Sequence, residues 1–547
     1  MIPFHTMQAA PFLLAALAAA FLALPRAKSD PEDWRGLAVR VFAYWAISIL
    51  LLFTISARFI PLVALGLVAL ALAPKAPAQK IAFYIGVVFA VPSEYQEYVP
   101  FPGVNYLIIL NHAKVLALVL LLPLCVGGGK AAASPSARGR RRENGIWRKA
   151  DILFGIWIAI VAILDLRMTQ TFTNSLRHFA DIGLELVLPY LAVRRSVRSM
   201  NDIQIVLWGL LLGLLILTAL GLLSGLQNWL HYKPLGDNAL GWTGAFRGGG
   251  VRVNVTLSSI LLGQLMVVCM ALLFWRRRVA DQPWLPLMWL LPCAFVLEAT
   301  GSRGAILAAI VAVGGLVYFR TRAAGTRTFI GVGGASLLAI TYMTLQSTGF
   351  DAVDEYGTFD YRQQLLETAA VKIRQVPLLG DADYYDDPLF EPLRQGQGII
   401  DFVNGYVQVA LGYGLLGLGL LLASLAAAFF GTAKGTYVLM RQNRTHGEPG
   451  AGFALGIALS SLGVMLMTVS FVSYIELFLI LLIALNVCYT QAALTEKRKA
   501  EPSLNPTEAG EPPAPSRRPL AAEAEREPAS VSPWPQGYTP GRTGWPS

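Results

Sequence analysis

Several arginines of this apolar chain lie beside glycines or at the edge of a hydrophobic run, where a cation is unusual. Arg247 and Arg252 flank the glycines of GWTGAFRGGGVRVNV, and Arg303 lies in ATGSRGAILA. Arg362 opens an amphipathic run, and Arg167 and Arg177 bracket the connection DLRMTQTFTNSLRH. A guanidinium at a membrane boundary is costly unless it faces a cavity or pairs with an anion. Its fork of donors suits the oxygens of phosphate or pyrophosphate.

Converging on one cavity, such arginines would form a receptor for a lipid-linked phosphate. Each arginine taken alone has a simpler explanation, which is pairing with a nearby carboxylate or extending to the membrane interface. Arg252 and Arg303 favour the functional explanation because neighbouring glycines permit close approach of a ligand.

Other chemistry has little support in the sequence. His112 lies within an apolar run and is expected to be a core residue, whereas His178 and His231 are candidates for proton transfer. No histidine pair or acid–histidine grouping has metal-ligand spacing, and no phosphate-binding glycine loop precedes a lysine. We therefore expect no metal and no cofactor. Four cysteines all fall in apolar runs and are expected to be packing residues.

The composition predicts an all-α polytopic membrane protein. The chain has 547 residues, of which 55% are hydrophobic and 14% charged, and this is too apolar for a soluble protein. Apolar runs long enough to approach the bilayer thickness predict about twelve to fifteen spans. The candidate spans are 9–24, 37–56, 60–73, 81–92, 104–126, 150–166, 178–193, 203–224, 256–275, 285–299, 304–319, 328–345, 404–430, 451–472 and 474–492.

Basic residues are unevenly divided between alternate connections. One set of connections holds 31 Lys and Arg and the other holds 11, so the first set is predicted to be cytoplasmic. The net charge of +10 therefore reflects membrane orientation, and no nucleic acid is expected. The predicted regions are a transmembrane region (1–345), a large periplasmic loop (346–403), further transmembrane helices (404–499) and a disordered cytoplasmic tail (500–547).

The long polar loop is where an active site would be assembled. Its run YRQQLLETAAVKI predicts a helix that ends at Pro377-Leu378-Leu379-Gly380. An acidic patch follows, and the chain then becomes apolar again at IIDFVNGYVQVALGYGLLGLGLLL.

Two stretches resemble the O-antigen ligase and O-antigen polymerase superfamily. ATGSRGAILAAIVAVGGLVYF resembles its Ser-Arg-Gly-containing span. YRQQLLETAAVKIRQVPLLG, followed by VNGYVQVALGYGLLGLGLLL, resembles its large periplasmic loop and the next helix. The resemblance covers roughly 241–422. Each motif alone is weakly specific, but the order and spacing of the motifs around one large loop make the resemblance more specific.

The resemblance implies a metal-independent, GT-C-like glycosyltransferase of the bacterial inner membrane with its active site facing the periplasm. Such enzymes pass a glycan from undecaprenyl pyrophosphate to a sugar hydroxyl of lipid A–core or of another lipid-linked repeat unit. Implied partners are these substrates, membrane lipids and other polysaccharide assembly proteins. Carried over, Arg303 matches the Ser-Arg-Gly arginine, Arg362 the loop-helix arginine, and Arg252 (less securely Arg247) the arginine before the preceding span.

One departure concerns the general base. Ligases of this superfamily carry a histidine before the asparagine of the re-entry motif, where this chain has Val403 before Asn404. Asp401 is the nearest replacement, and Asp383, Glu391 and His231 are weaker ones. Arg303 would also stabilise the leaving group, and Asn404 and Tyr406 could orient the sugar.

The missing histidine favours a polymerase of O-antigen, capsule or exopolysaccharide over a lipopolysaccharide ligase. Two other classes stay open. One is a transporter or flippase for a lipid-linked or anionic solute, although no related halves are visible. The other is a non-catalytic scaffold for envelope polysaccharide assembly.

Overall fold

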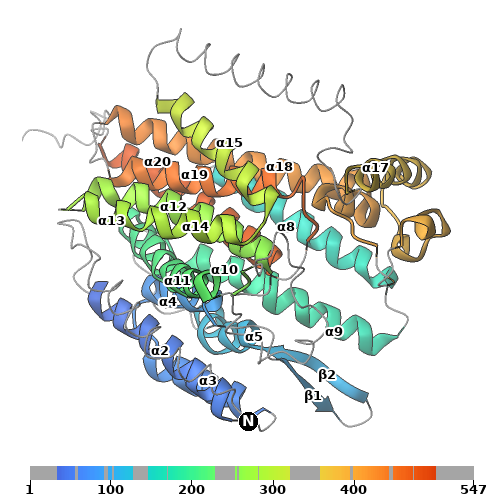
Figure 1. Cartoon of the computed structure of the whole chain (residues 1–547), viewed down its shortest axis with the longest axis horizontal. Coiled ribbons are helices and arrows are strands. Elements are labelled where there is room, and N and C mark those ends of the chain that lie inside the picture. Colours follow the sequence, from blue (N-terminus) through green and yellow to red (C-terminus); the bar gives the residue numbers. More distant parts are fainter. Residues whose placement is uncertain are drawn as a thin grey trace, which may run out of the picture. The chain divides into compact units, whose positions relative to one another are not determined.

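The computed structural model describes residues 34–55, 59–91, 96–101, 104–126, 146–168, 171–227, 253–255, 258–280, 282–320, 358–394, 398, 400–442, 447–471 and 474–500 (Figure 1). Several predicted features lie outside these residues. They are the spans 9–24 and 328–345, nearly all of the tail 500–547, Arg247, Arg252 and His231.

The described part is a set of helices with one two-stranded sheet. The longer elements are α2 (Trp34–Thr54), α3 (Ile60–Leu72), α4 (Pro77–Val88), β1 (Gln96–Phe101), β2 (Val104–Asn111), α8 (Ile146–Asp165), α9 (Phe172–Ile182), α10 (Leu188–Ser196), α11 (Met200–Gln227), α12 (Ser259–Val279), α14 (Leu290–Ala299), α15 (Arg303–Arg320), α17 (Thr358–Gln375), α18 (Gly405–Arg441), α19 (Gly447–Met465) and α20 (Ile475–Ala500). The shorter ones are α5 (His112–Leu116), α6 (Leu122–Val126) and α13 (Trp284–Met288), with π-helical turns η1 (Ala117–Leu121) and η4 (Gly183–Val187) and 3₁₀ turns η3 (Leu166–Met168), η7 (Tyr384–Asp386) and η8 (Pro388–Leu393).

Six of these helices are long and apolar enough to cross a membrane, namely α2, α11, α12, α18, α19 and α20. The prediction of an all-α polytopic membrane protein is therefore confirmed. The most enclosed of the six are α11 and α20, whose most apolar windows are 94% and 89% buried inside the protein. These two helices form much of the apolar core around which the others pack.

Two predicted spans were wrong in detail. The span at 104–126 begins as β2, which pairs antiparallel with β1, because an apolar run rich in aromatic and β-branched residues suits a strand as well as a span. The span at 178–193 is part of a longer helical run that starts at Phe172. The Thr171 hydroxyl caps that start by accepting from the backbone N–H of Asn174, and a π-helical turn at 183–187 separates α9 from α10.

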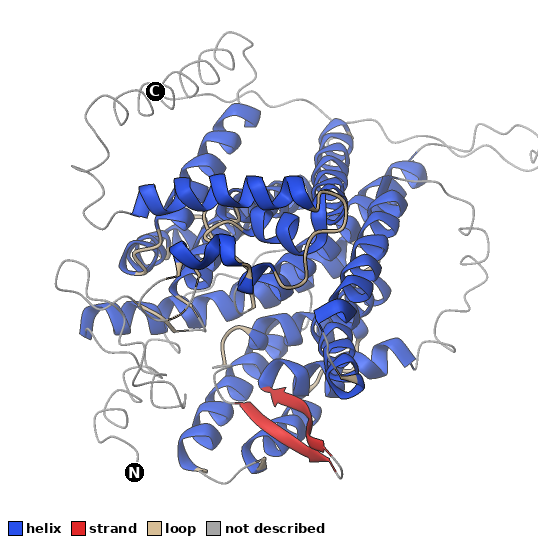
Figure 2. Ribbon diagram, turned by 90° about the vertical axis from the view of Figure 1, so that its right-hand side faces the viewer, coloured by secondary structure: helices blue, strands red, loops and turns tan. Residues whose placement is uncertain are grey.

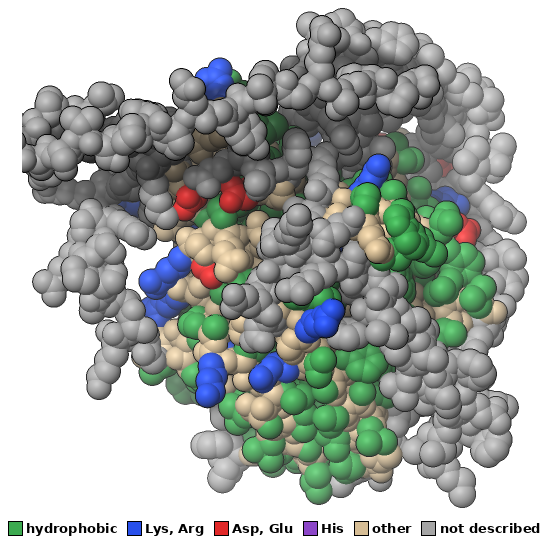
Figure 3. Space-filling view, turned by 90° about the vertical axis from the view of Figure 1, so that its left-hand side faces the viewer, with side chains coloured by type: hydrophobic (Ala, Val, Ile, Leu, Met, Phe, Trp, Pro, Cys, Tyr) green, Lys and Arg blue, Asp and Glu red, His purple; other side chains and the backbone are tan. Residues whose placement is uncertain are grey.

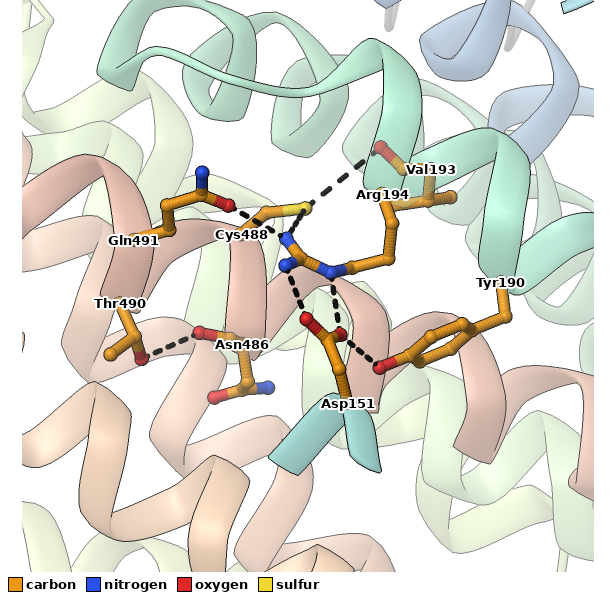
Figure 4. Close-up of polar contacts among 8 residues, drawn as sticks. All are labelled: Asp151, Tyr190, Val193, Arg194, Asn486, Cys488, Thr490 and Gln491. Carbon is orange, nitrogen blue, oxygen red and sulfur yellow. Dashed lines mark hydrogen bonds and ion pairs between the residues drawn. The ribbon is translucent and has the colours of Figure 1, made fainter. Parts of the chain in front are cut away.

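A buried ion pair joins α8, α10 and α20 (Figure 4). Arg194 donates from Nε and Nη2 to the two carboxylate oxygens of Asp151 at 2.8 and 2.7 Å, and the Tyr190 hydroxyl donates to the same carboxylate at 2.6 Å. Arg194 also donates to Gln491 at 3.1 Å. A bidentate arginine–carboxylate pair whose two partners come from different helices stabilises the packing of those helices.

The hairpin β1–β2 and helix α17 lie towards the right-hand side of Figure 1, which faces the viewer in Figure 2. On the opposite face, Lys and Arg side chains are scattered between hydrophobic patches over the described surface (Figure 3). The connection 276–284, which was predicted to be cytoplasmic, joins α12 to α13, and α13 lies towards that side in Figure 1.

The polar loop is folded around a small core of its own. This core consists of Leu365, Ala369, Phe390, Leu393, Ile400, Phe402 and Leu411. The buried Lys372 of α17 reaches the acidic patch, where its Nζ lies 2.5 Å from Asp381 and also pairs with Asp387. The prediction of a large, partly helical loop is confirmed, and we call residues 358–404 the loop unit.

Candidate functional site

The loop unit is fixed to the start of α18 by backbone hydrogen bonds. The N–H of Asp381 donates to Leu411 at 2.7 Å, and the N–H of Leu415 donates to Pro377 at 2.8 Å. These hydrogen bonds can form because the helical backbone of α18 is interrupted at Gly414, which has φ 69° and ψ −174°. The interruption frees backbone donors and acceptors that the loop then satisfies.

Two glycines make this contact possible. Gly380 has φ 66°, and a Cβ built on it would lie 2.4 Å from the Leu411 carbonyl oxygen and 2.5 Å from the Gly414 nitrogen. A Cβ on Gly414 would lie 2.2 Å from the Leu378 carbonyl oxygen. Both positions need a left-handed backbone and the absence of a side chain. The Pro-Leu-Leu-Gly motif (377–380) and the Gly-Tyr-Gly motif (412–414) therefore pack backbone against backbone. We call this contact the joint.

Arg167, in the turn η3 that follows α8, binds the joint from a third segment of the chain. Its Nη1 donates to the carbonyl of Gly380 at 3.0 Å, and its Nη2 donates to Leu379 at 3.0 Å and Gly412 at 2.9 Å. Its Nε donates to Leu164 at 3.0 Å, which holds the side chain against the end of α8. The guanidinium therefore binds backbone carbonyls on both sides of the joint.

A cavity of about 260 Å³ lies beneath this joint. It is enclosed by the end of α8, by α9 and η4, by the loop unit, by the start of α18 and by the segment leading into α20. Its lining residues are Trp157, Val161, Leu164, Asp165, Arg167, His178, Ile182, Leu186, Ala382, Tyr384, Gln408, Val409, Gly412, Tyr413, Phe471 and Glu476. A space of this volume corresponds to roughly eight or nine waters.

The polar part of the lining holds a histidine and two carboxylates. His178 Nε2 lies 2.7 Å from Asp165 Oδ2, and the Asp165 side chain is only 4% exposed. The hydroxyl of Tyr413, which lines the same cavity, is a further hydrogen-bonding neighbour of the Asp165 carboxylate. Glu476, in the first turn of α20, lines the same cavity.

The rest of the lining suits a sugar ring. Trp157, Tyr384, Tyr413 and Phe471 are aromatic residues of the lining; rings of this kind can pack against the apolar face of a pyranose, and the carboxylates and hydroxyls suit its polar edge. The Gln408 amide oxygen accepts from the backbone N–H of Phe471 at 2.8 Å, so this wall is held in place. A small pocket with apolar walls and few convergent polar groups is typical of a small-molecule site.

Arg303 is the first residue of α15 and is exposed. A Cβ on the next residue, Gly304, would lie 2.2 Å from the Thr468 hydroxyl and 3.6 Å from the Val469 side chain. That segment continues to Phe471 in the cavity wall. Arg303 therefore precedes a glycine that packs against the segment 468–471, and this segment reaches the cavity wall at Phe471.

Arg362 and Asp401 are brought together by the loop unit. Tyr361 holds the backbone of Asp401 at both ends, because its hydroxyl accepts from the Asp401 N–H at 3.0 Å and donates to the Asp401 carbonyl at 3.2 Å. Burial raises the pKa of the Asp401 carboxyl, and the Arg362 guanidinium acts in the opposite direction. The neighbouring Phe402 ring packs on Tyr384, which lines the cavity, with 5.1 Å between ring centroids.

Asn404 and Tyr406 have structural partners at the start of α18. The Asn404 side-chain oxygen caps the helix by accepting from the N–H groups of Tyr406 and Val407 at 3.0 and 3.2 Å. The Tyr406 hydroxyl donates to the carbonyl of Gly463 at 2.8 Å. Their predicted roles in orienting the sugar stay predictions.

The remaining candidates are engaged elsewhere. Arg177 donates to the carbonyl of Tyr106 and lies over its ring, which ties α9 to the hairpin. Glu391 pairs with Arg394 at 2.9 Å, and Asp383 is exposed. Within the described ranges, no group of three His, Cys, Asp or Glu residues could hold a metal ion.

Residues 286–422 match the family model described as O-antigen ligase. This match covers about a quarter of the chain and supports its resemblance to the O-antigen ligase and polymerase superfamily. No curated protein matches the chain. The matched stretch contains Arg303, Arg362 and both glycine motifs, so the joint described above belongs to the superfamily's own segment. The match supports glycosyl transfer between a lipid-linked oligosaccharide and a glycan acceptor in general terms.

Much of the cavity comes from outside the matched stretch. Asp165, His178 and Glu476 all lie beyond residues 286–422. Only His178 was considered for proton transfer from the sequence. The available signal for the other two was slight, since each is a single acid at the end of an apolar run.

Proposed function

We propose that this protein transfers a glycan from undecaprenyl pyrophosphate to a sugar hydroxyl, and that it acts as a polymerase of O-antigen, capsule or exopolysaccharide. The observation that carries the proposal is the joint between the loop unit and α18. The joint lies within the matched segment. Its residues line a cavity large enough for a sugar, and it fixes the loop unit that carries Arg362.

The arginines have the chemistry that this reaction needs. As the glycosidic C–O bond breaks, negative charge develops on the pyrophosphate leaving group, and preorganised guanidinium groups stabilise such charge. Arg303 and Arg362 are proposed to bind the pyrophosphate, with Arg252 and Arg247 as further candidates. Arg303 and Arg362 are exposed in the described structure, whereas the guanidinium groups of Arg167 and Arg194 are engaged by other protein groups.

The side of the membrane follows from the charge pattern. The connections 167–177 and 346–403 both contribute to the cavity walls, and both belong to the set with few basic residues. The substrate of such a site is therefore proposed to be presented in the periplasmic leaflet of the inner membrane.

The test is transfer by the purified protein in proteoliposomes that contain a lipid pyrophosphate-linked repeat unit. Elongation supports a polymerase, transfer only to added lipid A–core shows a ligase, and movement between leaflets without transfer shows a transporter. Arg303→Ala and Arg362→Ala should each lower transfer by about 10²–10³-fold, as expected for loss of an electrostatic donor. Arg374→Ala, on the same helix as Arg362, is the matched control. Unchanged transfer in both variants at normal protein levels contradicts the assignment.

A further inference from the structure

The cavity contains a histidine–carboxylate pair that the resemblance did not predict. His178 comes from α9 and Asp165 from the end of α8, and their side chains meet at 2.7 Å. The histidine is accessible, with 38% of its side chain exposed, while Asp165 is nearly fully buried. A buried carboxylate behind an accessible imidazole is the arrangement in which the carboxylate orients a histidine base.

The hydrogen bond decides which ring nitrogen is available. An ionised carboxylate only accepts hydrogen bonds, so Nε2 of His178 carries the proton directed at Asp165 Oδ2. Nδ1 is then the nitrogen that can accept a proton. Among the described residues no hydrogen-bond partner occupies Nδ1, and His178 lines the cavity.

Asp401 is less suited to this role, although it was the first replacement suggested by the sequence. It does not line the cavity among the described residues. Its backbone is also held by Tyr361 on the loop unit, and its carboxyl is next to Arg362 and not to the cavity lining. A general base works best when its pKa lies near the operating pH, and the ordinary pKa of histidine, about 6.5, meets this condition.

We propose that the cavity binds the acceptor sugar and that His178, positioned by Asp165, is the general base that accepts the proton of its attacking hydroxyl. This inference rests on the proposed function. His178 takes the place of the loop histidine that Val403 replaces.

The step balances as a displacement at the anomeric carbon of the donor. The acceptor oxygen forms a bond to that carbon while its proton moves to Nδ1 of His178. The bond from the carbon to the lipid pyrophosphate breaks, and its electron pair leaves with the phosphate oxygen. The imidazolium that results is stabilised by Asp165 and returns its proton to solvent or to the departing pyrophosphate.

Several charged groups face His178 and influence its titration. They are Asp165 on α8, Asp181 on its own helix and Glu476 on α20. Lys114 pairs with Asp181 at 2.6 Å and lies 3.4 Å from Glu185, so it neutralises part of this acidic surround. Arg167 lines the cavity, and its guanidinium donates its hydrogen bonds to backbone carbonyls.

The experiment compares His178→Gln with wild type in the proteoliposome transfer assay as a function of pH. The variant should lower kcat by about 10²–10⁴-fold, the usual contribution of a general base, with KM for the acceptor changed by less than about threefold. The wild-type rate should fall at low pH, where His178 is protonated, and the residual rate of the variant should lack this acid limb. Asp165→Asn should shift the acid limb and lower kcat.

Leu176→Gln is the matched control, because it introduces the same residue on α9 at a side chain that is 46% exposed and does not line the cavity. Melting temperatures in detergent show whether each variant folds. Normal kcat in folded His178→Gln overturns the inference, and so does a reduced rate that keeps the wild-type acid limb. A wild-type protein that transfers no glycan would instead contradict the proposed function itself.

Discussion

Arg167 and Gly380 are 213 positions apart in the chain, yet the guanidinium Nη1 donates to the Gly380 carbonyl at 3.0 Å. The same guanidinium reaches Leu379 and Gly412, so one side chain binds both halves of the joint between the loop unit and α18. This contact connects the end of α8, which carries Asp165, to the loop unit. The geometry of the cavity therefore depends on it.

Arg167→Lys is expected to loosen the loop unit. A lysine ammonium is a point charge without the planar fork, and it cannot reach three carbonyls in this arrangement. Loss of charge-assisted hydrogen bonds should cost about 1.5–3 kcal/mol. Limited proteolysis within 358–400 should become faster, and the melting temperature should fall. Arg374→Lys, at an exposed position of α17, is the control, and equal proteolysis of the two variants would contradict the clamp.

The joint predicts opposite effects for alanine substitution at its two glycines and at Gly419, a glycine of α18 outside the joint. Gly414→Ala and Gly380→Ala each place a Cβ within 2.5 Å of backbone atoms at a left-handed position, so both should destabilise the protein by well over the roughly 1 kcal/mol of the conformational term alone. Gly419→Ala meets nothing within 4 Å and should be neutral or stabilise by about 0.5–1 kcal/mol. Thermal unfolding in detergent separates the cases. A melting temperature for Gly414→Ala at or above that of Gly419→Ala would show that the joint is not tight.

The loop helix and its end could be predicted from the sequence, because an amphipathic period followed by Pro-Leu-Leu-Gly is a local signal. The structure places α17 at Thr358–Gln375, directly before that motif. The hairpin could not be predicted, since VNYLIILN fits a strand and the start of a span equally well. The spacing of apolar residues distinguishes a helix from a strand only when the element is long.

The cavity could not be predicted for a different reason. Asp165, His178 and Glu476 come from three segments, and each is a single polar residue near the end of an apolar run. Their convergence depends on how α8, α9 and α20 pack, which no local pattern contains. Arg167 resembled a phosphate ligand for the same reason, because the carbonyls of the joint that it binds lie more than 200 residues away in the chain.

The ion pairs of Lys372 predict how the loop unit responds to pH. Hydrogen bonds with Lys372 lower the pKa of Asp381 and Asp387 below the usual 3.8. Burial alone would lower the pKa of Lys372, but its hydrogen bonds to both carboxylates outweigh this and raise the pKa above 10.5. The carboxylates therefore contribute stability that is present above their usual pKa and lost as the pH falls through their lowered values. The lysine contributes stability that is present below 10.5 and lost as the pH rises through its raised value.

Hydrogen exchange of α17 should accordingly be slowest between about pH 5 and 9 and should accelerate outside that range. Lys372→Gln removes the shared cation and leaves two neighbouring carboxylates, so its exchange should be faster at neutral pH and should slow when the carboxylates are protonated. Lys434→Gln, which replaces an exposed lysine on α18, is the control. An α17 whose exchange in Lys372→Gln stays as slow as in wild type at neutral pH would contradict the role of the pair.

Asp401 and Arg362 form the last testable relationship, because the same carboxylate was also a candidate base. If Asp401 serves to orient Arg362, Asp401→Asn should lower transfer by about tenfold or less and should keep the acid limb that His178 produces. It should also add little in an Arg362→Ala background, since two residues that act together are not additive. Asp383→Asn, at an exposed position of the same loop, is the control. A loss of about 10²–10⁴-fold together with loss of the acid limb would instead make Asp401 the base, and His178→Gln in the same assay would then retain its activity.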